Sequence, residues 1–199
     1  MKTVYLSLLA ALIALPSHAA TVVLNQAALA GLPDETVGWG FTITADPNQW
    51  ILITHADFVP DPGFNPVGVF TAFITQPPNS NIVVGANSGN GEVNPWTQAF
   101  DNALLTGIGS YHINDFQSLG DRVEGAIVLS YDAYSRSPND PAFDPTSDIL
   151  ALGQSTSAPA SVTVGAAAAV PEPATWSFLL AALCTLVAAR QRLPRRYRF

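Results

Sequence analysis

Positive charge and cysteine are almost absent from the main part of this 199-residue sequence. Residues 20–170 contain fourteen Asp and Glu against two basic side chains, Arg122 and Arg136, a net charge of −12. Such a surface repels nucleic-acid phosphates and anionic lipid headgroups, so we expect no nucleic-acid partner. The only cysteine in the sequence is Cys184. Residues 20–170 therefore have no disulfide, no thiol nucleophile and no cysteine metal ligand.

Familiar catalytic motifs are missing as well. The sequence contains no Gly-x-Ser-x-Gly elbow, no His-Glu-x-x-His, no Walker loop and no dinucleotide fingerprint. Carboxylate pairs could be drawn in several places, but any acidic domain of this size offers as many. We therefore assign no catalytic residue and no required cofactor, and expect a protein that is not an enzyme.

The N-terminus has the three parts of a secretory signal peptide. Lys2 supplies the positive charge, residues 4–15 form an apolar run, and Pro16 precedes the small residues Ser17 and Ala19. That run is shorter than the roughly 20 residues of a membrane-spanning helix. We predict that residues 1–19 direct export through the Sec translocon and are removed by signal peptidase.

The C-terminus combines a proline motif, an apolar run and a basic end. Residues 174–189 carry no charge, and as a helix these sixteen residues would reach about 24 Å, against roughly 30 Å of hydrocarbon core. Arginine snorkelling and bilayer thinning can close that gap. Five arginines then place the C-terminus in the cytoplasm by the positive-inside rule. They are Arg190, Arg192, Arg195, Arg196 and Arg198.

The tail also resembles a known sorting signal. The string Val-Pro-Glu-Pro-Ala-Thr-Trp at 170–176, followed by the apolar run and the arginines, is similar to the PEP-CTERM signal of Gram-negative bacteria. The resemblance covers residues 171–199 and implies recognition of Pro171, Glu172 and Pro173 by an exosortase, a membrane-embedded transpeptidase-like enzyme. The enzyme would remove the helix and the basic tail.

The same resemblance implies a location and a process. The precursor would be anchored transiently in the inner membrane, and the processed protein would reach the cell surface or the extracellular matrix. The implied process involves exopolysaccharide and biofilm. Residues 166–170, mostly alanine, would link the sorting signal to an exported domain at residues 20–165.

The sequence of the exported domain predicts an all-β fold. Residues 37–44 alternate large apolar with small or polar side chains, and 122–134 place Val123, Ile127 and Leu129 on one face. We expect 37–44 and 50–58 to form a hairpin, and note that 94–105 could hold a helical turn. A polar loop is expected at 135–148. Further strands are expected at 67–75, 82–84, 107–114 and 161–165.

Short strands separated by Pro, Gly and Asn turns are typical of sandwiches. We predict a two-sheet antiparallel β-sandwich of broadly immunoglobulin-like architecture, followed by a single C-terminal transmembrane helix at about 174–189.

Two features of the domain suggest ligands. Asp140, Asp144 and Asp148 lie in a loop that contains two prolines, and calcium prefers such oxygen-rich loops. The alternative is turn chemistry, in which Asp side chains bond their own backbone. Trp50 and Trp96 lie beside turns, and an exposed indole could stack on a sugar of an exopolysaccharide; Trp39 is expected in the core.

A non-catalytic surface or matrix protein is therefore the expected function. The alternative that stays open is a secreted hydrolase acting on matrix polysaccharide through carboxylates or through His55 and Asp57. These two residues are two positions apart in a predicted strand and would share one face, where they could act as acid and base.

Overall fold

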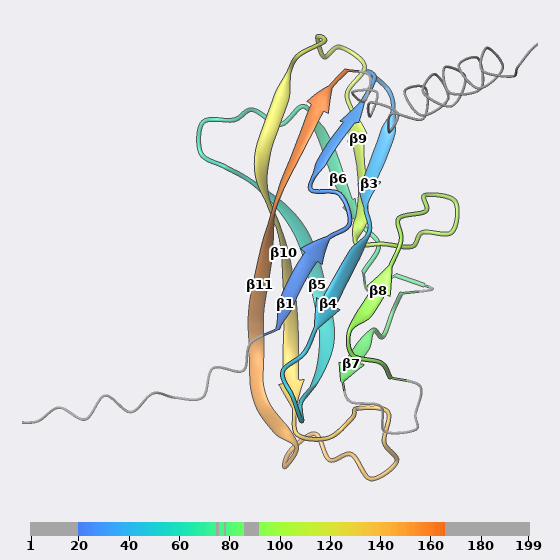
Figure 1. The fold of residues 1–199 in the computed structure, drawn as a ribbon, viewed down its shortest axis with the longest axis vertical. Helices are drawn as coiled ribbons and strands as arrows, with labels where there is room; N and C mark the ends of the chain where they lie inside the picture. The colour runs from blue at the N-terminus through green and yellow to red at the C-terminus, as the bar shows by residue number, and fades with distance from the viewer. Residues whose placement is uncertain (1–19, 75, 78, 86–91, 166–199) are drawn as a thin grey trace, which may run out of the picture. The chain divides into compact units, whose positions relative to one another are not determined.

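The computed structural model describes residues 20–74, 76–77, 79–85 and 92–165, which form eleven β-strands and no helix (Figure 1). The prediction of an all-β fold is confirmed. The described part of the chain has no helix with the length and hydropathy for a membrane crossing. The predicted signal peptide, linker and sorting signal lie outside the described residues.

The largest sheet has five strands, and β10 (Arg122–Tyr134) is its centre. β10 pairs antiparallel with two long neighbours, β5 (Trp50–Pro60) and β11 (Ile149–Val164). Its alternating face is buried as predicted, with Val123, Ile127 and Leu129 fully enclosed. The outer strands are β2 (Ala28–Gly31), parallel to β11, and β7 (Val83–Gly85), antiparallel to β5.

The remaining strands form two three-stranded sheets, so the strands make three hydrogen-bonded sheets where two were predicted. One has the order β1 (Thr21–Leu24), β4 (Phe41–Thr44) and β8 (Trp96–Gln98). The other has the order β3 (Thr36–Trp39), β9 (Gly109–Ile113) and β6 (Gly68–Ala72).

Gly40 separates β3 from β4, so the single strand predicted at 37–44 is two strands in two sheets. A Cβ at Gly40 would lie 2.6 Å from the Asn25 side-chain nitrogen and 2.9 Å from the Gln98 carbonyl oxygen. Only glycine allows these segments to approach so closely.

Buried aromatic rings join the layers. Trp39 of β3 stacks on Phe58 of β5 with 5.6 Å between ring centroids, and Tyr111 of β9 meets Phe58 edge-on at 5.6 Å. Trp39 is completely buried, as predicted. Ile43 of β4 and Ile51 of β5 belong to the same core. The fold is therefore sandwich-like, with apolar faces turned inward.

The predicted hairpin of 37–44 with 50–58 is wrong. β4 pairs with β1 and β8, whereas β5 pairs with β10 and β7. The turn between them carries the chain from one sheet to another, with Asn48 in the left-handed region at φ 63°. A period of two shows that a strand has one buried face, but it does not show whether the next strand lies beside it or opposite it.

The strand predicted at 161–165 is the end of the much longer β11, and three strands, β1, β2 and β8, were not predicted. β8 lies in the segment 94–105, which was considered as a possible helical turn. The first half of β11 is largely exposed and has no simple apolar alternation. It is a strand because β10 pairs with it along its length. The loop predicted at 135–148 is confirmed.

Gly125 tests the packing of the central strand. A Cβ there would overlap the Val59 carbonyl oxygen and lie 2.8 Å from the Pro60 Cα. Because both neighbours are backbone, Gly125→Ala must displace β5, and we expect it to destabilise the fold by about 1–3 kcal/mol. Ala126→Ser, on the other face, should change stability by less than about 0.5 kcal/mol. Urea unfolding measures the stability of both variants. Equal midpoints would contradict the close packing of Gly125 against β5.

Candidate functional site

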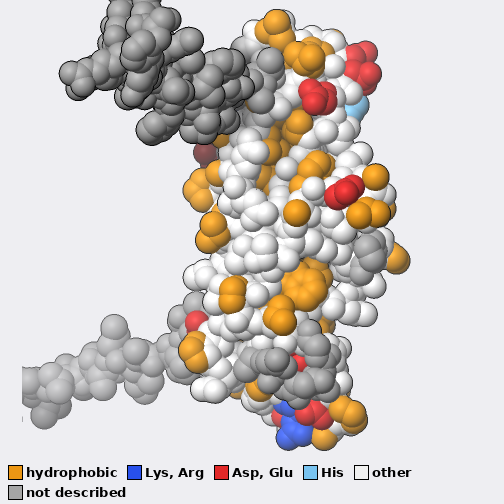
Figure 2. All heavy atoms as spheres, turned by 45° about the vertical axis from the view of Figure 1, so that its right-hand side comes forward, with side chains coloured by type: hydrophobic (Ala, Val, Ile, Leu, Met, Phe, Trp, Pro, Cys, Tyr) orange, Lys and Arg blue, Asp and Glu red, His pale blue; other side chains and the backbone are white. Residues whose placement is uncertain are grey.

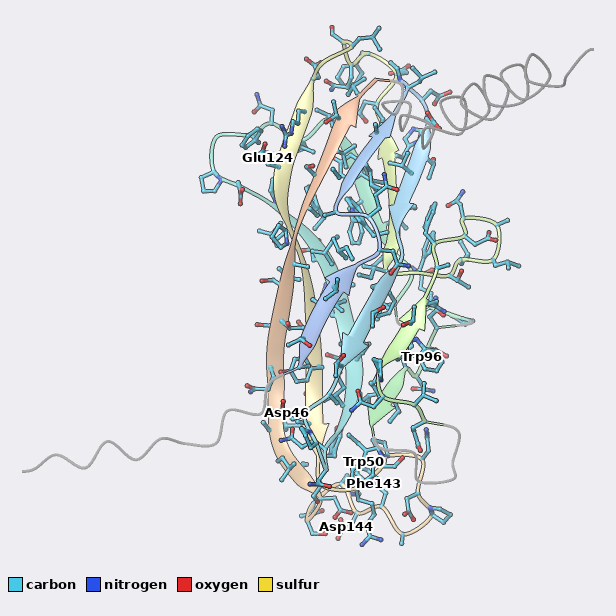
Figure 3. The ribbon with its side chains drawn as sticks, in the orientation of Figure 1. Asp46, Trp50, Trp96, Glu124, Phe143 and Asp144 are labelled. Atoms are coloured by element: carbon cyan, nitrogen blue, oxygen red, sulfur yellow. The ribbon has the colours of Figure 1, made fainter. Side chains whose placement is uncertain are left out.

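The loop from Ser135 to Asp148 lies at one end of the five-stranded sheet, where β10 passes into β11. Trp50 is paired with Tyr134, the last residue of β10. Figure 3 shows Trp50, Phe143 and Asp144 together at this end and Glu124 towards the other. We call residues 135–148 with Trp50 the loop end. The structure thus brings the predicted aspartates close to one of the two predicted tryptophans.

The loop end contains packed aromatic rings. Phe143 meets Tyr134 edge-on at 5.2 Å. Burial, and then the nearby Asp132 carboxylate, raise the pKa of Tyr134. Trp50 packs against Gly85, where a Cβ would overlap the indole. Because these contacts occupy part of the ring surface, the loop end offers a small aromatic surface and not an open platform.

Trp50 and Trp96 are both half-buried, and Trp96, on β8, packs against the core. Both indole Nε1 atoms are buried and have no hydrogen-bond partner among the described residues. An indole that binds a sugar usually leaves a ring face and its N–H open to the ligand. Sugar contact at these residues stays a prediction.

The three aspartates each hold a turn of their own loop. Asp140 Oδ1 accepts a hydrogen bond from the Ala142 amide at 2.8 Å, and Asp144 Oδ1 accepts one from the Thr146 amide at 2.8 Å. Asp148 Oδ2 accepts from the Asp144 amide at 2.9 Å and lies 3.5 Å from Arg136 Nε. These bonds match the turn-chemistry alternative.

The fit to calcium is poor in this arrangement. Among the described residues, no three His, Cys, Asp or Glu side chains are grouped closely enough to hold a metal ion. Calcium would need several oxygens converging on one point, whereas these carboxylates point to separate amides. Calcium binding stays a prediction.

Hydrogen bonding lowers the pKa of one aspartate of the loop, Asp144. The pKa of Asp144 is lowered from 3.8, first by the Thr146 amide and then by the Ser147 side chain, although the carboxylate is exposed. Both donors stabilise the charged form. The turn is therefore held by a carboxylate that stays ionised in mild acid.

Glu92 is a buried carboxylate that the sequence analysis missed. It is one of five buried polar or charged residues in the described part of the chain, at 3% exposure, and the other four are uncharged. The Ser137 hydroxyl donates a hydrogen bond to Glu92 Oε1, and Asn139 Nδ2 donates another at 3.1 Å. Ser137 is itself buried. Glu92 therefore ties the start of the 135–148 loop to the segment before β8.

His55 and Asp57 share a face of β5, as predicted. Both are exposed, while Ala56 and Phe58 between and beside them are buried. His112 lies on the outer face of β9, 3.7 Å from Asp34, whereas its neighbour Tyr111 points into the core. The two histidines thus lie on outer faces of different sheets, and the structure does not bring them together.

Two hollows lie near Arg122, away from the loop end. The smaller, of about 190 Å³, is lined partly by Asp61, Arg122 and Glu124, and Arg122 is paired with Glu124 at 2.6 Å. The larger, of about 530 Å³, includes Phe64, Phe116 and Arg122. Neither hollow includes His55 or Asp57, and the hydrolase alternative stays a prediction.

No protein-family model matches this chain, and no curated protein matches it.

The variant Ser137→Ala tests whether the hydrogen bonds to Glu92 hold the 135–148 loop. Ser137→Ala removes a donor from a buried carboxylate, so we expect a loss of about 1–3 kcal/mol in the free energy of unfolding. Ser135→Ala is the matched control, because its hydroxyl is exposed and its bonds to Asp148 are long, 3.3 Å each. Equal urea midpoints for the two variants would contradict a stabilising role of the bond between Ser137 and Glu92.

Asp144 tests the turn. Because its folded pKa is depressed, its contribution to loop stability is present above the unfolded pKa and is lost as pH falls through the folded pKa. Carboxyl NMR should give a midpoint below 3.8 for Asp144. Ser147→Ala should move that midpoint upward, while Ser155→Ala on β11 should leave it unchanged. A midpoint at the ordinary value in the unmodified protein would refute the turn bonds.

Proposed function

We propose that this chain is an exported, non-catalytic surface or matrix protein, sorted and processed by an exosortase through Pro171, Glu172 and Pro173. One observation carries the proposal. A Pro-Glu-Pro motif, an uncharged apolar run and five arginines follow one another in that order at residues 171–199. The two prolines favour an extended motif, the uncharged run suits a membrane segment, and the arginines favour the cytoplasmic side of the membrane.

Processing would change the charge of the protein. The five tail arginines leave with the tail, and the exported part keeps its strong excess of carboxylates. Such a surface favours neutral polysaccharide over acidic polysaccharide, since polyanions are repelled. We propose that the processed domain contacts neutral exopolysaccharide, with Trp50 and Trp96 as the candidate contacts.

We also infer that the fold counts as an immunoglobulin-like two-layer sandwich. The pairing β3–β9–β6 follows the B-E-D order of that fold, and β5–β10–β11 follows its C-F-G order. The continuity of β3 with β4 then joins the two small sheets into one layer. β7 and β8, which lie in sequence between β6 and β9, are additions to the pattern. Such a scaffold presents loops at its two ends.

Glu172→Ala tests the sorting step. In cells that contain an exosortase, we expect the variant to accumulate as an uncleaved precursor in the membrane fraction, because the motif between the prolines is altered. Asp34→Ala, an exposed acid in the domain, is the control and should be processed. Immunoblots of membrane and medium fractions separate the two forms. Normal processing of Glu172→Ala would overturn the proposal.

A further inference from the structure

The end of the domain opposite the loop end is where the described chain leaves the fold. The Gly165 amide donates to the Gly31 carbonyl at 2.8 Å, and the Val164 amide donates to the Asp121 carbonyl at 2.8 Å. The Gly120 amide donates back to Val164 at 2.8 Å. The last described residues are therefore held between two loops, 32–35 and 114–121. We call these two loops with Gly165 the exit end.

Both loops expose large apolar side chains beside this point. Leu32 follows Gly31 and is 50% exposed, and Leu119 precedes Gly120 and is 72% exposed. Phe116, on the same loop as Leu119, is 77% exposed. Leu32 and Leu119 are each next to a residue that bonds the end of β11, whereas Phe116 also borders the larger hollow beside Phe64. Large exposed apolar side chains concentrated at one end of a domain mark interaction surfaces. We call Leu32, Phe116 and Leu119 the apolar rim.

The chain length after Gly165 limits how far this rim can be from a membrane. Ala174, the first residue of the uncharged apolar run, is nine residues further along. Nine residues span at most about 30 Å when fully extended. If the run enters a bilayer, the exit end stays within that distance of its surface, and the loop end is the far end of the sheet.

We propose that the apolar rim contacts the outer surface of the membrane that anchors the precursor, with its side chains at the boundary of headgroups and acyl chains. The inference rests on the proposed function, because only an anchored precursor holds the domain at a membrane. Apolar side chains at that depth leave water, and the tether keeps the rim close enough for a weak contact to persist.

The charges around the apolar rim determine which lipid headgroups the rim can approach. Asp34, Glu35, Asp115 and Asp121 lie on the two loops, and Arg122, which follows them, is paired with Glu124. Figure 2 shows acidic beside hydrophobic side chains at the upper end of the domain. Acidic side chains are repelled by anionic headgroups, so the surface suits zwitterionic lipid, and anionic lipid weakens the contact at low salt.

The test uses the exported chain, residues 20–199, with Cys184→Ser to remove the natural thiol, reconstituted in phosphatidylcholine vesicles. An environment-sensitive dye is attached at Ser118→Cys, exposed on the rim loop, or at Thr146→Cys, exposed at the loop end. Nitroxide groups on the acyl chains serve as the quencher. We expect quenching at position 118 and none at position 146. Phosphatidylglycerol in the vesicles should reduce the quenching, and salt should restore it.

The rim variant Leu32→Ser with Phe116→Ser and Leu119→Ser should lose the quenching at position 118 while the chain still floats with the vesicles. Leu104→Ser is the matched control, since Leu104 is 65% exposed but lies on the 101–106 turn. It should keep the quenching.

Three outcomes would overturn the inference. Flotation without quenching at position 118 leaves the anchor intact and removes the rim contact. A dimer that depends on the rim, again without lipid quenching, assigns the rim to a second copy of the chain. Failure of the exported chain to float refutes the anchor of the proposed function, and the rim contact with it.

Discussion

Contact between Trp39, Phe58 and Tyr111 is the constraint on which the fold depends. The described domain has no cysteine, so side-chain packing and not a disulfide must hold β3 and β9 against β5. Fully burying a large apolar side chain contributes roughly 1.5–3 kcal/mol. Three touching rings therefore fix the separation of the layers and leave the outer faces and the end loops free to vary.

The fold could be predicted from the sequence where a strand shows its burial in its own residues. β10 alternates strictly, and its buried face was predicted residue by residue. β11 could not be recognised beyond its last residues, since its exposed first half is a strand only because β10 pairs with it. The division at Gly40 depends on how closely Asn25 and Gln98 approach. No local pattern records such long-range contacts.

The same limit applies to the loop end. The Asp-Pro loop and its turn bonds were foreseen, because Asp side chains bond amides two residues away. The burial of Glu92 could not be predicted, because an acidic residue between Gly91 and Val93 has the pattern of an exposed loop. Its hydrogen-bond partners, Ser137 and Asn139, are more than forty positions away in the sequence. Bonds between residues that are close in the sequence can be predicted from the sequence. A buried carboxylate can be identified only once its partners from distant parts of the chain are known.

The parallel pairing of β2 with the end of β11 has a mechanical consequence. A force applied through residues that follow Gly165 runs along β11, and four residue pairs from Ser161 to Val164 join that segment to β2. A pull directed along β11 is parallel to both strands, so it loads these hydrogen bonds together in shear instead of opening them one at a time. β2, near the start of the domain, thus helps to hold the strand that bears the load.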